Sequence, residues 1–438
     1  MWISLFLGYC LFCFNWLVFS KLKGTSNGDN GKDSASSGWS ALFPAIASGI
    51  AAESVNYSVT AARGIFTIPA SFILTKLGYR KACLLACGLA TTALPLIFSP
   101  HWTVLIVGRI IMAAGGTLTI IYISPLLSKL TLPAKRKKLA ALNGFTFAIS
   151  GLVVNVLFMI QSISTFLTTH WRWVSATSAI MSFIPLLLFY RYGGNFEISS
   201  LSEKLKVRIP DNYETLLRDK EAWTWIITYS FLLVVSILFS SFVPGRLSDL
   251  IPSIKTSLSG LDWSSLYTVI FFVGTCCGLY VLGRFNLQDV RRTSIVSLAI
   301  KLTIASWGLI TVAAVIYNST QSVVANILML IGVFCLSFFG LGVQSVLLYI
   351  PLEYKNYSPQ KTATFFSCLW GIGYIILTLY YILSSALNQL AGAAYSLIFI
   401  TALLVLFYFF TTRLRESRPE FATFWNWRRQ RRLAIQGL

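Results

Sequence analysis

Two arginines lie inside long apolar stretches of the sequence, where an ionisable side chain is costly. Arg63 stands about eight residues into the apolar block 54–75, and Arg109 stands about seven residues into the block 102–125. An arginine at the centre of a membrane costs roughly 2.5–3.5 kcal/mol on insertion scales, so its presence there suggests a function. At a rise of about 1.5 Å per residue, both side chains are expected at one depth, roughly 10–12 Å from the same membrane boundary.

Two guanidinium groups at one depth indicate an anionic ligand, because the planar fork of donors on a guanidinium matches a carboxylate or a phosphate group. Two structural alternatives stay open. Arg109 can bond to backbone carbonyls of neighbouring helices, or either side chain can extend along its helix to the membrane surface.

The acidic residues are distributed differently. All 15 lie in loops, in tails or at the edges of apolar blocks, and Glu53 and Asp249 come nearest to a block interior. Both histidines, His101 and His170, also lie at block edges. The sequence therefore offers no carboxylate or histidine at mid-membrane to carry a coupling proton, and no residues with the spacing of a catalytic or metal site. We expect no catalytic residue, no metal and no cofactor, and we expect a protein that is not an enzyme.

The composition indicates which elements position these residues. Of the 438 residues, 56% are apolar and 11% are charged, whereas a soluble domain carries about 25% charged residues. A soluble multidomain protein is thereby excluded. The apolar residues form twelve blocks, each near the ~20 residues that a helix needs to cross a bilayer. The blocks are 3–20, 54–75, 82–99, 102–125, 139–162, 172–190, 223–245, 264–283, 293–317, 322–350, 362–386 and 391–412.

A polar stretch of mixed charge, 192–222, divides these blocks into six and six. We expect an all-α integral membrane protein with twelve transmembrane helices in two six-helix bundles. The expected domains are an N-terminal bundle (1–191), a cytoplasmic linker (192–222), a C-terminal bundle (223–412) and a basic cytoplasmic tail (413–438). Whether residues 39–52 extend the first helix or lie at the membrane interface stays open.

The net charge of +20 reflects the orientation of the chain in the membrane. If both termini and the linker share one side, that side holds 26 of the 35 Lys and Arg residues, and an excess of basic residues marks the cytoplasmic side. Lys21, Lys23 and Lys32 would lie outside. A cleaved signal peptide is the alternative for the first block, but the start lacks the basic segment and the A-x-A-like site of such peptides.

This charge distribution removes the reason to expect a nucleic-acid partner. The expected partners are a small-molecule substrate and the lipid bilayer, with anionic lipid at the tail, where seven Arg and two Trp follow the last block. We expect a monomer that is a multi-pass protein of the cell membrane.

The two halves share a spacing of glycine and proline. Gly116 and Gly342, Pro125 and Pro351, and Pro133 and Pro359 are each separated by 226 positions, at the ends of the fourth and tenth blocks. Internal repeats of this kind are common in transporters.

With these features the chain resembles the major facilitator superfamily over its whole length. In the loop after the second block, Lys76, Gly78 and Arg80 match the loop motif of that family, while Ser71, Thr75 and Tyr79 depart from it. The segment 105–116, which contains Arg109, Gly115 and Gly116, is similar to the fourth helix of the family. The resemblance implies transport by alternating access.

It also implies residues that control opening and closing. In the family, a loop carboxylate and nearby basic groups latch one state, and position 75 here lacks that acid. The second half retains a version of the latch, although a solvated charged loop is an equal alternative. The candidates for gating are Lys76, Gly78, Arg80, Gly115, Gly116, Asp289, Arg291 and Glu353.

Polar and aromatic residues on the helices that line the cavity of the resembled fold are further candidates for contact with a solute, beside Arg63 and Arg109. They are Asn15, Tyr122, Asn155, Tyr229, Gln344 and Trp370. The alternative for the amides is a hydrogen bond between helices, worth about 0.6–2 kcal/mol. Tyr229 and Trp370 can instead be packing or interface aromatics.

These features favour a transporter of a small organic anion, such as a sugar phosphate or a carboxylate. A transporter of a neutral solute such as a sugar is the alternative, since the cavity arginines of organophosphate antiporters lie on helices 1 and 7, where this sequence has none at mid-depth. A receptor or scaffold on the same fold also stays open. A membrane enzyme ranks low, because the outer loops are mostly short and hold two histidines.

Overall fold

A computed structural model of the chain describes residues 1–24, 38–46, 49–130, 133–194, 216–252, 254, 260–354 and 359–435. These residues fold almost entirely into helices, and the extended pairings found among them are two isolated bridges. Most of the expected linker, 195–215, lies outside the described residues.

The main helices of the N-terminal half, within the described residues, follow one another with short breaks. They are α1 (Trp2–Lys21), α4 (Ser54–Thr67), α5 (Ala70–Leu77), α6 (Tyr79–Thr91), α7 (Ala93–Leu96), α8 (Trp102–Leu130), α9 (Pro133–Met159), α10 (Gln161–Thr169), α11 (Trp171–Met181) and α12 (Phe183–Tyr192). Two single turns, α2 (Trp39–Leu42) and α3 (Gly49–Ala52), lie between α1 and α4.

The C-terminal half has the same character. Its helices are α15 (Lys220–Leu233), which continues through a π-helical turn (Val234–Leu238) into α16 (Phe239–Ser241), then α17 (Val243–Leu250), α19 (Trp263–Gly283), α20 (Arg292–Thr320), α21 (Val323–Gly340), α22 (Gln344–Leu347), α23 (Pro359–Ala391), α24 (Ala393–Thr411) and α25 (Phe424–Ile435). Short 3₁₀ turns cover Pro44–Ile46, Arg284–Leu287 and Ile350–Glu353.

Ten helical segments within the described chain are long and apolar enough to cross a membrane. The expected blocks 54–75 and 82–99 are not among them, and each contains a break between two helices. Pro69 separates α4 from α5, and Pro95 lies in the short α7 that follows α6. Proline lacks a backbone N–H and clashes with the preceding turn, so a break at these positions has a physical cause.

Residues 39–46 do not extend the first helix. Trp39 is fully buried, its indole Nε1 donates a hydrogen bond to the carbonyl of Phe19 at 3.1 Å, and its ring stacks on the ring of Phe19 with centroids 6.2 Å apart. The segment therefore folds back over the end of α1.

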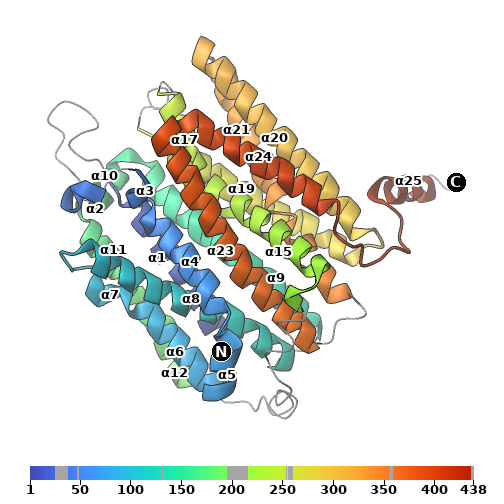
Figure 1. The fold of residues 1–438 in the computed structure, drawn as a ribbon, viewed down its shortest axis with the longest axis horizontal. Helices are drawn as coiled ribbons and strands as arrows, with labels where there is room; N and C mark the ends of the chain where they lie inside the picture. The colour runs from blue at the N-terminus through green and yellow to red at the C-terminus, as the bar shows by residue number, and fades with distance from the viewer. Residues whose placement is uncertain are drawn as a thin grey trace.

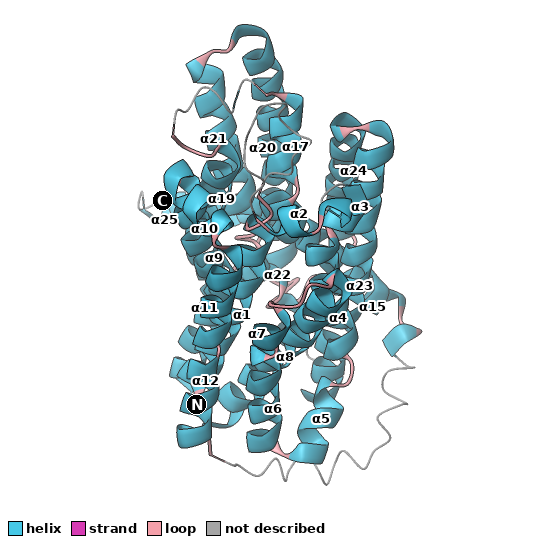
Figure 2. Ribbon diagram, turned by 90° about the vertical axis from the view of Figure 1, so that its left-hand side faces the viewer, coloured by secondary structure: helices cyan, strands magenta, loops and turns pink. Residues whose placement is uncertain are grey.

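The helices form two groups that meet along two helix pairs. In Figure 1 the blue-to-green helices of the first half gather at one side and the yellow-to-red helices of the second half at the other. Helix α4 packs along α23, and α9 packs along α19. Figure 2 shows α4 beside α23 from the second direction, with α5 continuing beyond the end of α4.

Glycine permits the close approach of each pair. A Cβ atom on Gly64 of α4 would lie 2.9 Å from the carbonyl oxygen of Gly371 on α23, and 3.1 Å from the backbone nitrogen of Ile375. On the other pair, a Cβ atom on Gly151 of α9 would overlap the ring of Phe272 on α19. Small residues at helix crossings allow this kind of backbone contact in membranes.

The crossing at Gly64 can be tested by adding a single methyl group. We expect Gly64→Ala to destabilise the protein by about 1–3 kcal/mol, because the new Cβ meets backbone atoms that cannot move independently. Gly308→Ala is the matched control, since no atom lies within 4 Å of its Cβ position and alanine favours a helix. Thermal unfolding in detergent measures both; equal midpoints for the two variants would contradict the close crossing.

Candidate functional site

Arg63 lies at the centre of the contact between the two halves. Its side chain is 1% exposed, and its Nη2 donates a hydrogen bond to the hydroxyl of Tyr9 on α1 at 2.7 Å. Its guanidinium carbon lies 4.4 Å from the ring centroid of Tyr374 on α23, and 5.6–5.7 Å from the rings of Tyr9, Phe12 and Trp16. We call these four aromatic residues the aromatic cage; it is built from both halves of the chain.

The cage compensates the charge of Arg63 only in part. Aromatic faces attract a cation, and a desolvated contact of this type is worth about 2 kcal/mol. A guanidinium has five N–H donors, and the buried Nε of Arg63 has no hydrogen-bond partner among the described residues. No ion pair of Arg63 with a carboxylate is found in this part of the chain either. Arg63 therefore has donor capacity left for an acceptor that enters the interface.

Tyr229 and Trp370 extend the aromatic surface beyond the cage. The ring centroids of Tyr229 on α15 and Trp370 on α23 are 5.8 Å apart, and those of Trp370 and Tyr374 are 6.2 Å apart. Gly373 makes this possible, because a Cβ atom there would lie 2.8 Å from the ring of Tyr229. Of the residues that the sequence predicts for solute contact, the structure thus brings Arg63, Tyr229 and Trp370 into one region.

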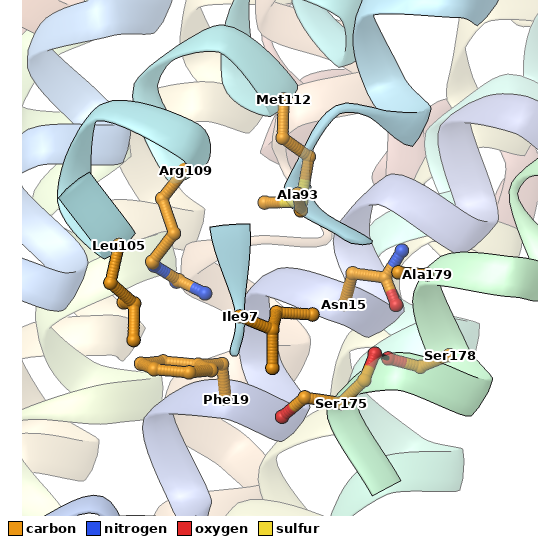
Figure 3. A pocket seen from close by; sticks show the side chains of 10 residues that line it. All are labelled: Asn15, Phe19, Ala93, Ile97, Leu105, Arg109, Met112, Ser175, Ser178 and Ala179. Carbon is orange, nitrogen blue, oxygen red and sulfur yellow. Dashed lines mark hydrogen bonds between the residues drawn. The ribbon is translucent and has the colours of Figure 1, made fainter. Parts of the chain in front are cut away.

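Arg109 lies elsewhere, inside the N-terminal half. Its Nη2 donates hydrogen bonds to the carbonyls of Val55 at 3.1 Å and Trp16 at 3.4 Å, and its guanidinium carbon lies 4.4 Å from the ring centroid of Phe19. Arg109 therefore bonds to backbone carbonyls of neighbouring helices, which was the structural alternative to anion binding. The side chain also borders a small cavity, shown in Figure 3, that Asn15 borders from the opposite side.

The remaining solute candidates make contacts within their own bundle. Asn15 Nδ2 donates a hydrogen bond to Ser182 at 2.8 Å, and Asn155 Nδ2 donates one to the carbonyl of Gly151 on its own helix at 2.8 Å. The hydroxyl of Tyr122 donates to the carbonyl of Ala70 at 3.1 Å, in the packing between α5 and α8. Gln344 begins the short α22 and is half-buried.

The gating candidates of the first half lie in two places. Lys76 and Arg80 are exposed on either side of Gly78, which has a φ of +75° and separates α5 from α6. Arg80 Nη2 donates a hydrogen bond to the carbonyl of Tyr190 at 3.1 Å. Gly115 and Gly116 lie within α8. A Cβ atom on Gly115 would overlap the backbone of α6, and one on Gly116 would overlap the ring of Phe12.

The gating candidates of the second half meet the tail. Glu353 Oε1 lies 3.2 Å from Arg292 Nη2 and 2.9 Å from Arg418 Nε, in ion pairs whose carboxylate is 5% exposed. Arg291 donates hydrogen bonds to the carbonyls of Phe421 at 2.7 Å and Pro419 at 2.8 Å. Asp289 is exposed beside them.

Glu416 in the tail completes this cluster. Its carboxylate accepts hydrogen bonds from the backbone N–H groups of Arg292 at 3.2 Å and Thr293 at 3.0 Å, and from the hydroxyl of Thr293 at 2.7 Å. It thereby caps the N-terminus of α20, where free N–H groups favour a negative charge. The tail segment 413–424 thus packs on the C-terminal half.

The aromatic cage could not be predicted from the sequence. Phe12 and Trp16 follow Tyr9 by three and seven residues, so the three residues share one face of α1. That spacing is a usable signal, but it does not distinguish a cage from ordinary packing. Tyr374 carries no such signal, because only the contact between the halves brings it to Arg63.

A second group of polar contacts joins the halves at the end of the molecule where residues 159–162 lie. We call this the outer end, following the orientation that the loop charges predict. Glu53 accepts a hydrogen bond from the hydroxyl of Tyr381 at 2.8 Å and lies 3.6 Å from Arg246 Nη2, while Asn56 Nδ2 donates to the hydroxyl of Tyr381 at 3.1 Å. We call Glu53, Asn56, Arg246 and Tyr381 the outer clasp.

Backbone contacts close the same end. Ile160 and Leu261 form an antiparallel bridge, in which Asp262 N–H donates to the carbonyl of Met159 at 2.8 Å and Gln161 N–H donates to the carbonyl of Gly260 at 3.1 Å. The outer end of the interface is therefore closed in this structure.

Comparison with known proteins places this geometry among transporters. A family model described as "Mycoplasma MFS transporter" matches residues 105–389. A protein of Mesomycoplasma hyopneumoniae is 25% identical over 410 residues, which are 90% of this chain and 82% of the relative. A "Major facilitator superfamily transporter" of Mycoplasma genitalium is 21% identical over 515 residues, covering 93% of this chain and 88% of the relative.

Solved structures share the fold at low identity. A D-xylose–proton symporter has a TM-score of 0.67 and 17% identity, covering 95% of this chain and 98% of its own. The fucose:proton symporter of E. coli has a TM-score of 0.58 and 13% identity, covering 94% of this chain and 98% of its own.

The outer clasp can be tested through the accessibility of the interface beneath it. Glu53→Ala removes the acceptor of Tyr381 and the partner of Arg246, so the outer end should open more often. Loss of about 1 kcal/mol corresponds to roughly a fivefold change in population. We expect a Thr60→Cys reporter, buried beneath the clasp, to react about fivefold faster with a membrane-impermeant thiol reagent in a background without the native cysteines.

Asp249→Ala is the control for this experiment. Asp249 pairs with the same Arg246 at 2.8 Å, but both residues lie on α17, so the pair does not join the halves. Equal labelling rates in the two variants would show that the clasp does not hold the outer end closed.

Proposed function

The chain belongs to the major facilitator superfamily, and we propose that it carries a small organic anion across the membrane by alternating access, with Arg63 binding the anionic group. The activity is transport and not enzymatic catalysis. A sugar phosphate or a carboxylate has the chemistry that a guanidinium binds best.

One observation carries this proposal: Arg63 is a buried cation between the two halves, with no carboxylate paired to it among the described residues and with its Nε unpaired. An anion that reaches this interface would complete the hydrogen bonding and balance the charge. Because the cage residues come from α1 and α23, a solute bound there would contact both halves. Contact with both halves is what allows a solute to couple its binding to their relative movement.

A neutral sugar is the second candidate, and the aromatic surface favours it. Trp370, Tyr374 and Tyr229 present neighbouring rings on which the apolar face of a sugar can stack. Arg63 can donate to sugar hydroxyls as well as to an anion. The likeness in fold to xylose and fucose symporters is consistent with this candidate.

We also propose that the chain crosses the cell membrane twelve times, with both termini in the cytoplasm. In this arrangement α4 with α5, and α6 with α7, each form one further span beside the ten found among the described residues. Spans broken at proline are common where neighbouring helices supply the missing hydrogen bonds. With twelve spans, six lie before the linker 192–222 and six after it, so we propose the bundles 1–191 and 223–412.

The outer clasp and the cytoplasmic clusters would then act at opposite ends of the two bundles. We propose that the contacts of Arg80 in the first half, and those of Arg291 and Glu353 in the second, hold the cytoplasmic ends in shape during the cycle. In the exposed tail helix α25, Trp425 and four arginines suit contact with anionic lipid at the membrane surface. We propose that the transporter is a monomer.

The topology can be tested with alkaline phosphatase fusions in a bacterial host, because the enzyme is active only outside the cytoplasm. We expect inactive fusions after Gly78 and after Asp289, and active fusions after Ser99 and after Thr320, on the predicted outer side. The fusion after Gly78 is decisive for the broken spans. Phosphatase activity at that position would contradict the twelve-span topology, even if the fusions after Asp289 and Thr320 behave as expected.

The substrate class can be tested in liposomes with a panel of organic anions and neutral sugars. We expect uptake of an anion, and we expect Arg63→Gln to lower kcat/KM by about 10–150-fold, as the loss of roughly 1.5–3 kcal/mol from a charged hydrogen bond predicts. Lys301→Gln is the control, because Lys301 is an exposed cation on α20 away from the cage. Its uptake should match that of the unaltered chain.

If the protein takes up neutral sugars alone, and Trp370→Ala abolishes that uptake, the result would contradict anion transport and support the neutral sugar as the substrate. Uptake of neither class by well-folded protein would contradict both and favour a receptor or scaffold.

A further inference from the structure

A small cavity with both polar and apolar lining residues lies within the N-terminal bundle, apart from the aromatic cage. Its volume of about 20 Å³ is close to that needed for a single water molecule. Figure 3 shows Arg109 entering it from one side, above the ring of Phe19, while Asn15 and two serines lie on the other side. The lining residues are Asn15, Phe19, Ala93, Ile97, Leu105, Arg109, Met112, Ser175, Ser178 and Ala179.

Polar atoms around this cavity lack partners within the described chain. Arg109 Nε, Asn15 Oδ1 and Ser175 Oγ are all buried and make no hydrogen bond there. Buried polar atoms in folded proteins are nearly always paired with protein, water or an ion. These atoms belong to residues that line the cavity, so an occupant within reach of them would supply the missing partners.

The charge of Arg109 indicates what occupies it. Arg109 is 4% exposed, and no ion pair with a carboxylate is found for it in the described part of the chain. Two backbone carbonyls and the face of Phe19 are its compensating contacts, and none of them carries a net negative charge. A buried charge without a counter-charge is costly, so an anion gains more from this cavity than a neutral water molecule does.

The opposite wall can present donors to such an anion. The amide of Asn15 can rotate by 180°, since its oxygen and nitrogen are nearly equivalent in shape. Its Oδ1 then accepts from the hydroxyl of Ser182, and its NH₂ group takes the position of the atom that lacks a partner in the present orientation. The Ser175 hydroxyl is also free to turn toward the cavity.

We propose that this cavity is a binding site for a small inorganic anion, chloride, which neutralises Arg109. The lining of the cavity includes neither Arg63 nor a residue of the aromatic cage, so the site is distinct from the proposed substrate site at Arg63. The apolar walls formed by Ile97, Leu105 and Met112 favour a weakly hydrated ion. Chloride here stabilises the N-terminal bundle and holds Arg109 between α1, α4 and α8.

Thermal unfolding of the full chain in detergent tests the site without any transport assay. We expect the midpoint to rise saturably by ~2–4 °C when chloride replaces gluconate at constant ionic strength, because a ligand that binds the folded state stabilises it. Bromide should act like chloride. A midpoint that is insensitive to this exchange would overturn the proposal.

Asn15→Asp separates the site from a general salt effect. It places a carboxylate of the same shape opposite Arg109, so it should supply the counter-charge and abolish the dependence on chloride while the protein stays folded. Asn326→Asp is the matched control, since Asn326 is a buried asparagine on α21 in the other bundle. It should retain the chloride response, and an equal response in both variants would contradict binding at Arg109.

Crystals grown in bromide give a direct readout. We expect one anomalous peak between Arg109 and Asn15 in the unaltered protein, and no peak there in Asn15→Asp. Ordered water in the cavity without an anomalous peak would show that the site holds water only.

Discussion

The buried charge of Arg63 is the constraint on which the central interface depends. A guanidinium that has lost its water needs compensation from its surroundings, and residues of both bundles supply it: Tyr9, Phe12 and Trp16 from one side and Tyr374 from the other. The cation thus attracts the two bundles to one point. A solute that binds Arg63 must replace part of that attraction, so the interaction that closes the centre is also the one a solute would use. Binding and opening are therefore linked through one side chain.

The two helix pairs across the interface are held by different physical means along their length. Near the centre, Gly64 lets the backbones of α4 and α23 approach, and Gly151 receives the ring of Phe272. These contacts depend on shape, because each glycine leaves space for atoms of the neighbouring helix. Toward the outer end the contacts are polar, with Thr60 and Thr378 hydroxyls 2.8 Å apart and the outer clasp beyond them. Polar contacts have defined partners, so they favour one arrangement over another. The interface therefore combines helix crossings that depend on shape with hydrogen-bonded contacts at the outer end.

Much of the architecture could be predicted from the sequence, because the cost of burying polar groups in a bilayer governs it. Long apolar blocks predicted the helices, and the charge of Arg63 inside one of them predicted a functional residue. The breaks near Pro69 and Pro95 occur at prolines, where a distortion of the helix is expected, but the sequence does not decide whether such a proline kinks or ends a helix. Equal depth suggested that Arg63 and Arg109 act together, but depth does not specify direction around a helix axis. Arg109 points into its own bundle, whereas Arg63 points to Tyr374 in the other, and that difference depends on packing between distant segments.

The cap that Glu416 forms on α20 links the order of synthesis to the completion of the fold. Helix α20 begins at Arg292, and the carboxylate that caps it lies 124 positions later, beyond the last long apolar helix. When α20 first enters the membrane, its N-terminal N–H groups have no such partner, and Arg291 lacks the tail carbonyls that it later contacts. Both sets of contacts form only after the tail has left the ribosome. The end of the second bundle that the tail contacts thus reaches its final structure only after the rest of the chain has been made, and a chain that ends before Glu416 would lack this cap.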